Sequence, residues 1–193
     1  MSSLPLTPEV LIAAYANGIF PMDVDGSIEW FSPDPRGIIE LDGFHVPSNV
    51  GRLYRSGRFA VRVDSCFEAV MRACADREEG TWISEEIVAA YLRLHKLGFA
   101  HSVETWQAGE LAGGLYGVAV GGAFFGESMF HRRPNASKIA LVAAVERLRE
   151  RGFVLLDIQF ITPHLRQFGA REIPRVEYLM RLKSALKVRA GFA

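Results

Sequence analysis

Two polar side chains, Asp157 and Gln159, stand in the apolar segment FVLLDIQF at residues 153–160. This composition predicts a buried strand, and the alternation of a strand places Leu155, Asp157 and Gln159 on one face. A carboxylate and an amide are costly to bury without hydrogen-bond partners. The pair therefore serves either a structural hydrogen-bond network or chemistry, and the pattern alone leaves both open.

The element that must position this strand is a helix predicted over residues 136–151. Asn135 is a favourable N-cap residue and Gly152 favours a stop. Apolar residues recur along the segment with helical spacing, namely Ile139, Leu141, Val142, Ala143, Val145 and Leu148. Before this helix, residues 101–130 predict three antiparallel strands joined by short turns that contain glycine. A meander, a helix and a further strand indicate an α+β domain.

The flanking segments predict further helices and one irregular stretch. Helices are expected at residues 8–18, 64–77, 84–98 and 176–187. Residues 19–41 carry several prolines and predict a long ordered loop or a set of turns. We place a boundary near residue 63, between a small N-terminal domain at residues 1–63 and a larger domain at residues 64–193.

Composition bounds the class of protein. The 193 residues are 49% hydrophobic and 23% charged, as in ordinary globular proteins with a substantial core. The 22 basic and 22 acidic side chains balance, so a polyanionic partner would need a local patch. The cysteines, Cys66 and Cys74, are too few for a disulfide framework, and the histidines lack metal-ligand spacing. With no transmembrane or signal segment in the sequence, we expect a cytoplasmic protein without a metal and without a membrane partner.

A local basic patch is nevertheless present. Arg52, Arg55 and Arg58 lie close together, with aromatic residues among them. Such a run is either a solvated face or a surface that contacts phosphates. Arg132 and Arg133 precede the helix predicted at residue 136 and could hold a phosphate there, or could simply be exposed.

Two other reaction classes are disfavoured by their motifs. The segment Gly126-Glu127-Ser128, with His131 and Asp157, suggests a serine hydrolase, but Met129 and Phe130 follow the serine and the G-x-S-x-G motif is absent. No glycine-rich phosphate loop precedes a helix. The same absence disfavours an N-acetyltransferase that depends on coenzyme A.

Six segments in sequence order carry a resemblance to a known family. They are Gly18-Ile19-Phe20-Pro21, Trp30-Phe31-Ser32-Pro33-Asp34-Pro35-Arg36, Gly80-Thr81-Trp82-Ile83, Gly126-Glu127-Ser128-Met129-Phe130, Ala136-Ser137-Lys138 and Asp157-Ile158-Gln159. Together they resemble the bacterial leucyl/phenylalanyl-tRNA–protein transferase family over almost the whole chain. The resemblance implies a small N-terminal domain before an acetyltransferase-like (GNAT-type) domain, with a mixed, largely antiparallel sheet flanked by helices.

The resemblance also implies a reaction and the residues that perform it. Leucine or phenylalanine, and sometimes methionine, moves from aminoacyl-tRNA to the α-amino group of proteins that begin with Arg or Lys, which marks them for degradation. Asp157 and Gln159 match the family's catalytic pair. Glu127 would lie at the rim of the pocket, where we expect its charge to bind the basic first residue. The implied walls of the aminoacyl pocket are Trp82, Leu115, Gly126, Leu141, Ala144, Leu148 and Leu156.

The remaining expectations concern the tRNA and the alternatives. Met22 stands where some relatives carry a tryptophan that stacks on the terminal adenine, so adenosine contact is expected there. Contacts with the tRNA backbone are expected from Arg52, Arg55 and Arg58. We expect a monomer without a cofactor. An N-acetyltransferase that depends on coenzyme A, or a non-catalytic protein that binds tRNA or peptides, remains the alternative.

Overall fold

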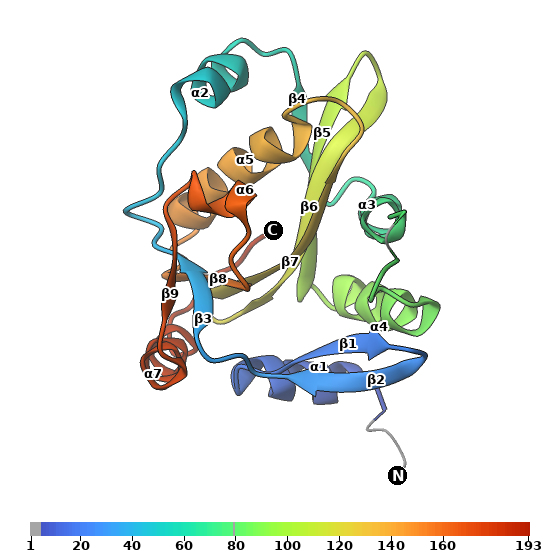
Figure 1. Cartoon of the computed structure of the whole chain (residues 1–193), viewed down its shortest axis with the longest axis vertical. Coiled ribbons are helices and arrows are strands. Elements are labelled where there is room, and N and C mark those ends of the chain that lie inside the picture. Colours follow the sequence, from blue (N-terminus) through green and yellow to red (C-terminus); the bar gives the residue numbers. More distant parts are fainter. Residues whose placement is uncertain (1–4, 79) are drawn as a thin grey trace.

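The computed structural model describes residues 5–78 and 80–193 (Figure 1). Its helices are α1 (Pro8–Ala16), α2 (Ser48–Arg55), α3 (Phe67–Ala75), α4 (Glu85–Lys96), α5 (Ala136–Glu150), α6 (Pro163–Arg166) and α7 (Arg175–Ala185). Its strands are β1 (Phe20–Val24), β2 (Ser27–Phe31), β3 (Arg36–Ile39), β4 (Ala60–Val63), β5 (Ala100–Gln107), β6 (Glu110–Val120), β7 (Ala123–His131), β8 (Leu155–Gln159) and β9 (Ala170–Ile173). The predicted α+β class is confirmed.

Seven strands form one sheet in the order β4-β5-β6-β7-β8-β3-β9. Neighbouring strands are antiparallel except β7 and β8, which run parallel, so the sheet is mixed and largely antiparallel as expected. The meander predicted at residues 101–130 is confirmed as β5, β6 and β7. A register shift between Tyr116 and Gly117 interrupts its second pair. A Cβ atom on Gly117 would lie 2.3 Å from the carbonyl oxygen of Phe125, so only glycine fits there.

β7 and β8 are paired along only part of their length. The paired residues are Ala123 with Leu155, Phe124 with Leu156 and Phe125 with Asp157. Beyond this point β7 continues to His131, whereas β8 ends at Gln159. The two strands therefore separate, and we call the place where they part the fork.

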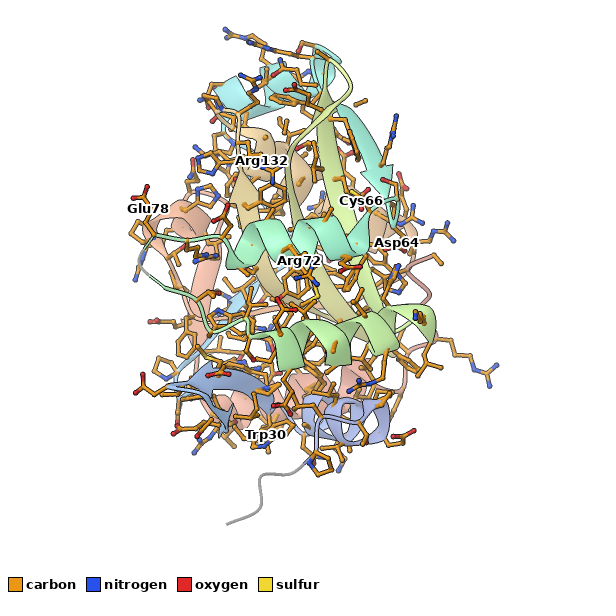
Figure 2. The ribbon with its side chains drawn as sticks, turned by 90° about the vertical axis from the view of Figure 1, so that its right-hand side faces the viewer. Trp30, Asp64, Cys66, Arg72, Glu78 and Arg132 are labelled. Atoms are coloured by element: carbon orange, nitrogen blue, oxygen red, sulfur yellow. The ribbon has the colours of Figure 1, made fainter. Side chains whose placement is uncertain are left out.

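Helices cover both faces of the sheet (Figure 1). α3 and α4 lie on one face and α5 lies on the other. Figure 2 shows α3 and α4 side by side across their face, with Arg72 of α3 between them. Its guanidinium pairs with Glu68 on its own helix and with Glu85 on α4. Buried apolar side chains fill the space under both sets of helices, so each face of the sheet has its own core.

The N-terminal segment is more regular than predicted. Helix α1 is confirmed, and the hydroxyl of Thr7 caps its first turn at 3.4 Å. The loop predicted at residues 19–41 is wrong, because β1 and β2 form a hairpin and β3 enters the main sheet. Asp25 and Gly26 make the two-residue turn, both with positive φ, which is the usual signal of an Asp-Gly hairpin. Pro21 is tolerated because both strands of a two-stranded sheet are edges.

Strand β3 bears on the domain organisation. It lies between β8 and β9, and β4 forms one edge of the same sheet, so two strands from the first 63 residues belong to the main sheet. The boundary expected near residue 63 stays a prediction. A division there would separate strands that are hydrogen-bonded to each other.

Helix α5 begins at Ala136, as its pattern predicts. Asn135 occupies the N-cap position, but its backbone is left-handed, with φ of 69°, and within the described chain its side chain makes no capping hydrogen bond. The start of the helix is therefore predicted correctly, while the capping contact is not.

Candidate active site at the fork

A cavity of about 510 Å³ opens at the fork between β7 and β8. The residues predicted to form an aminoacyl pocket all line it, namely Trp82, Leu115, Gly126, Leu141, Ala144, Leu148 and Leu156. Those on α5 share one face of the helix because they are spaced three and four residues apart. The structure therefore brings the predicted residues together around one space, and their role stays a prediction.

Among the polar residues that line the cavity are Glu127 on β7 and Gln159 at the end of β8. The amide Nε2 of Gln159 donates to Oε1 of Glu127 at 3.1 Å. Gln159 has a φ of 56°, in the left-handed region that non-glycine residues seldom adopt. Its side chain lines the cavity together with Leu156 and Ile158, whereas Asp157 is not a lining residue. The predicted common face for the side chains of Asp157 and Gln159 is therefore wrong, because strand alternation fails at this backbone.

Asp157 is fully buried beside the cavity wall, with 0% of its surface exposed. Arg36 donates to its two carboxylate oxygens, from Nε to Oδ1 at 2.9 Å and from Nη2 to Oδ2 at 2.7 Å. The hydroxyl of Tyr178 donates to Oδ2 at 2.6 Å, and the backbone N–H of Gln159 donates to Oδ1 at 2.9 Å. Asp157 thus contacts Gln159 through the backbone, and cationic and neutral donors satisfy its charge.

Glu127 is surrounded differently. Its Oε2 accepts a hydrogen bond from the hydroxyl of Tyr91 at 3.5 Å, and Tyr91 is hydrogen-bonded in turn to Tyr15. Burial raises the pKa of the Glu127 carboxyl to about 8, against the lowering effect of the nearby tyrosine hydroxyls. Near neutral pH this carboxyl is therefore mostly protonated. A cation bound beside it would favour the ionised form.

Several residues at the site were not predicted. The two carboxylates accept hydrogen bonds from Arg36, Tyr178 and Tyr91, and Tyr15 is bonded to Tyr91. Of these, only Arg36 falls in a segment that carries the family resemblance. Phe160 was also missed; it lines the cavity although 52% of its surface is exposed. An aromatic residue directly after the D-x-Q segment was the available signal for Phe160.

The expected tRNA contacts lie outside the cavity. Met22 is half-buried on β1, and the backbone N–H of the next residue, Asp23, donates to the carbonyl of Trp82 at 3.1 Å. The strand that carries Met22 therefore borders the cavity wall at Trp82. The three arginines of the predicted basic patch are exposed: Arg52 and Arg55 lie on α2, and Arg58 follows it. α2 is attached to α5 by a hydrogen bond of 2.6 Å from Tyr54 to Glu146.

Ser128 is engaged in a contact unlike that of a hydrolase nucleophile. Its hydroxyl accepts a hydrogen bond from Arg77 at 2.8 Å, while Asp157 is held by Arg36.

Within residues 5–78 and 80–193, no group of three or more His, Cys, Asp or Glu side chains is arranged to hold a metal ion. Among the described helices, none combines the length and the apolar character needed to span a membrane.

Comparisons of the sequence with known proteins identify a family. The family model for leucyl/phenylalanyl-tRNA protein transferase matches residues 38–183, and the model for the N-terminal domain of the same family matches residues 5–34. A leucyl/phenylalanyl-tRNA–protein transferase from Rubrobacter xylanophilus is 58% identical over 97% of this chain and 99% of its own. One from Herpetosiphon aurantiacus is 57% identical over 97% of this chain and 98% of its own.

The solved structures found are more distant. A GCN5-related N-acetyltransferase from Kribbella flavida is 13% identical with a TM-score of 0.47, over 86% of this chain and 60% of that chain. L-PGS from Bacillus licheniformis is 14% identical with a TM-score of 0.45, over 83% of this chain and 55% of that chain. Both scores are too low to carry an argument. The family models and the sequence identities extend over nearly the whole chain, and on that evidence the chain belongs to the leucyl/phenylalanyl-tRNA protein transferase family.

Proposed function

We propose that this chain transfers leucine or phenylalanine, with methionine as a minor donor, from aminoacyl-tRNA to the N-terminal α-amino group of proteins that begin with Arg or Lys. The product is marked for degradation. One observation carries the proposal: in a chain of this family, one cavity at the fork combines an aliphatic wall with Glu127 and Gln159. The wall suits an apolar aminoacyl side chain, and the two polar groups suit an amine.

The reaction is the aminolysis of an ester. The acceptor nitrogen attacks the carbonyl carbon of the aminoacyl group, a C–N bond forms, and the C–O bond to the ribose breaks. The proton lost by the amine ends on the ribose oxygen. Because the ester is activated, positioning of the two reactants can supply most of the catalysis.

Gln159 is proposed to orient the attacking amine. Its amide nitrogen is directed to Glu127, which leaves its amide oxygen to accept a hydrogen bond from the amine. An amide does not titrate near neutral pH, so the ribose hydroxyl or a water molecule carries the proton. Asp157 supports Gln159 from the buried side through the backbone.

Glu127 is proposed to recognise the basic first residue of the acceptor. Its hydrogen-bond donors, Tyr91 and Gln159, are uncharged, and burial raises its pKa to about 8. A guanidinium or an ammonium would supply the cation that stabilises the carboxylate. Acceptors with a neutral or acidic first residue offer no such partner.

The aliphatic wall is proposed to select the amino acid. Ala144 is small and lies between Leu141 and Leu148 on the α5 face of the cavity. The space beside it suits a phenyl ring, so phenylalanine should be used at least as well as leucine. A strong measured preference for leucine in a transfer assay would contradict this assignment.

The terminal adenosine of the tRNA is proposed to contact Met22 and the exposed ring of Phe160. A thioether packs on a base more weakly than an indole does, whereas an exposed phenyl ring provides a stacking surface. Phe160→Ala should therefore raise the KM for aminoacyl-tRNA at least about fivefold. An unchanged KM would exclude Phe160 from the tRNA site.

Because the donor is aminoacyl-tRNA, we propose that the chain acts in the cytoplasm. We also propose that it acts as a monomer and without a cofactor.

The test of the function is a transfer assay with labelled Phe-tRNA and Leu-tRNA and peptides that begin with Arg, Lys, Asp or Ala. We expect label on the peptides that begin with Arg or Lys. Gln159→Ala should lose most of this activity while circular dichroism shows a folded protein, and Gln107→Ala, on β5, is the matched control. Absence of label on every peptide, or turnover of acetyl-coenzyme A in its place, would overturn the proposal.

A further inference from the structure

Arg36 lies at the centre of a closed set of hydrogen bonds and is 1% exposed. Besides its two bonds to Asp157, it donates from Nη1 to the carbonyl of Gly18 at 3.0 Å and from Nη2 to the hydroxyl of Tyr178 at 3.3 Å. Its guanidinium carbon lies 5.0 Å from the ring centroid of Phe20 and 4.5 Å from that of Tyr178. The side chain is therefore fixed by hydrogen bonds in its plane and by aromatic rings around it.

The carboxylate of Asp157 has no acceptor position left for a substrate. Oδ1 accepts from Nε of Arg36 and from the backbone N–H of Gln159, and Oδ2 accepts from Nη2 of Arg36 and from Tyr178. An ionised carboxylate offers about four such positions. Asp157 thus cannot take a proton from the acceptor amine while these donors hold it.

The hydrogen bond from the backbone N–H of Gln159 to Asp157 bears on which side chain faces the cavity. Gln159 keeps a left-handed backbone although it is not glycine, and such a conformation persists only where its surroundings enforce it. Its N–H is fixed to Asp157, and its amide reaches Glu127 from this backbone. If the carboxylate of Asp157 moved, the strand end could relax to an extended conformation and turn the amide away.

We infer that Arg36 is a positioning residue that acts through Asp157: it fixes the carboxylate that holds the backbone of Gln159 in the left-handed conformation, so that the amide of Gln159 faces the cavity. The inference rests on the proposed function for its kinetic consequence. Asp157 then supports the backbone of Gln159 and takes no part in the proton transfer.

Arg36→Lys tests the inference, because lysine keeps the charge and loses the two-point contact with the carboxylate. We expect kcat for transfer to fall about 10- to 100-fold, while the KM for the acceptor peptide stays within about threefold. Arg171→Lys, on an exposed ion pair with Glu40, is the matched control and should leave both constants unchanged. An unchanged kcat in Arg36→Lys would overturn the inference.

A double-mutant cycle separates positioning from a general loss of stability. If Arg36 acts through Gln159, adding Gln159→Ala to Arg36→Lys should cost less than about threefold more in kcat. Fully multiplicative losses would contradict the inference. Should Arg36→Lys fail to fold, Tyr178→Phe takes its place in the cycle, because it removes one donor to Oδ2 and leaves the ring in place.

A readout without activity distinguishes this inference from the proposed function. The chain has three glutamines, Gln107, Gln159 and Gln167, so selective ¹³C labelling of glutamine gives few backbone signals, and Gln159→Ala assigns the one of interest. In the wild type its shifts should report a left-handed backbone, and in Arg36→Lys they should move to extended values. Unchanged shifts would overturn the inference. A wild-type protein without transfer activity would overturn the function and leave this structural result intact.

Discussion

The two carboxylates beside the fork, Asp157 on β8 and Glu127 on β7, are held in opposite ways. Asp157 is fully buried and receives a two-point ion pair from Arg36. Glu127 reaches the cavity and receives hydrogen bonds from the neutral groups of Tyr91 and Gln159. Burial raises the pKa of Glu127 to about 8.

The difference shows how environment assigns different tasks to the same functional group. A buried carboxylate that carries its own cation is satisfied, and it can serve as a fixed support. One whose hydrogen-bond donors are neutral has a raised pKa, and a cation bound beside it would favour the ionised form. The comparison therefore supports the proposed roles, with Asp157 as a structural support of the site and Glu127 as the group that recognises the acceptor.

We expect the largest effect from removing the ion pair between Arg36 and Asp157. Asp157→Ala leaves the guanidinium of Arg36 buried without its partner, which should destabilise the fold by about 3–5 kcal/mol and remove most of the transfer activity. Urea denaturation followed by circular dichroism measures the first effect, and the transfer assay measures the second. Glu127→Ala is the matched control. Equal stability losses in the two variants would remove the distinction between the carboxylates.

Glu127→Gln tests the raised pKa of Glu127 and its proposed role in binding the acceptor. The pKa of Glu127 is about 8 in the folded chain against an ordinary value of 4.5. Between those values the folded state keeps a proton that the unfolded state has lost, so stability falls as the pH rises through this window. The variant should show a smaller fall between the ends of the window in urea denaturation, and should use an arginyl peptide about tenfold less well. A pH dependence equal to that of the wild type would contradict the raised pKa.

A change on α5 tests whether the aliphatic wall is independent of both carboxylates. Ala144→Phe fills part of the cavity, so the use of phenylalanine relative to leucine should fall about tenfold. The preference among acceptor peptides should not change, because Ala144 is apolar and offers no hydrogen-bonding side-chain group to the acceptor. Competition between Phe-tRNA and Leu-tRNA in one reaction measures the ratio. An unchanged ratio would mean that the donor side chain binds elsewhere.

The smallest effect is expected furthest from the fork. The double reversal of Arg52 and Arg55 to Glu on α2 should raise the KM for aminoacyl-tRNA and flatten its dependence on salt concentration, with a slope lower by about two. Both side chains are exposed, so the fold should be unaffected. The KM measured over a series of salt concentrations tests this. The same slope in variant and wild type would exclude this patch as a tRNA surface.

Local patterns predicted most of the elements at the site. Helical spacing brings Leu141, Ala144 and Leu148 to one face of α5, the meander follows from its turn residues, and β8 follows from its apolar composition. The left-handed backbone of Gln159 was not predictable, because glutamine has no local preference for it. Its N–H is bonded to Asp157, whose partner Arg36 lies far away in the sequence. Arg36 was missed as the partner of Asp157 because the two are 121 positions apart.

The position of β3 in the sheet also constrains the order in which the molecule can fold. The meander β5–β7 and helix α5 pair with segments near them in the sequence, so they can form while the chain is still being synthesised. Strand β3 lies between β8 and β9, and its partners are made more than a hundred residues after it. Residues 36–39 therefore stay unpaired in the sheet until residues 155–173 have been made. A nascent chain can form helix α5, which carries part of the aliphatic wall of the cavity, at an early stage, but the ion pair between Arg36 and Asp157 can form only after β8 has been made.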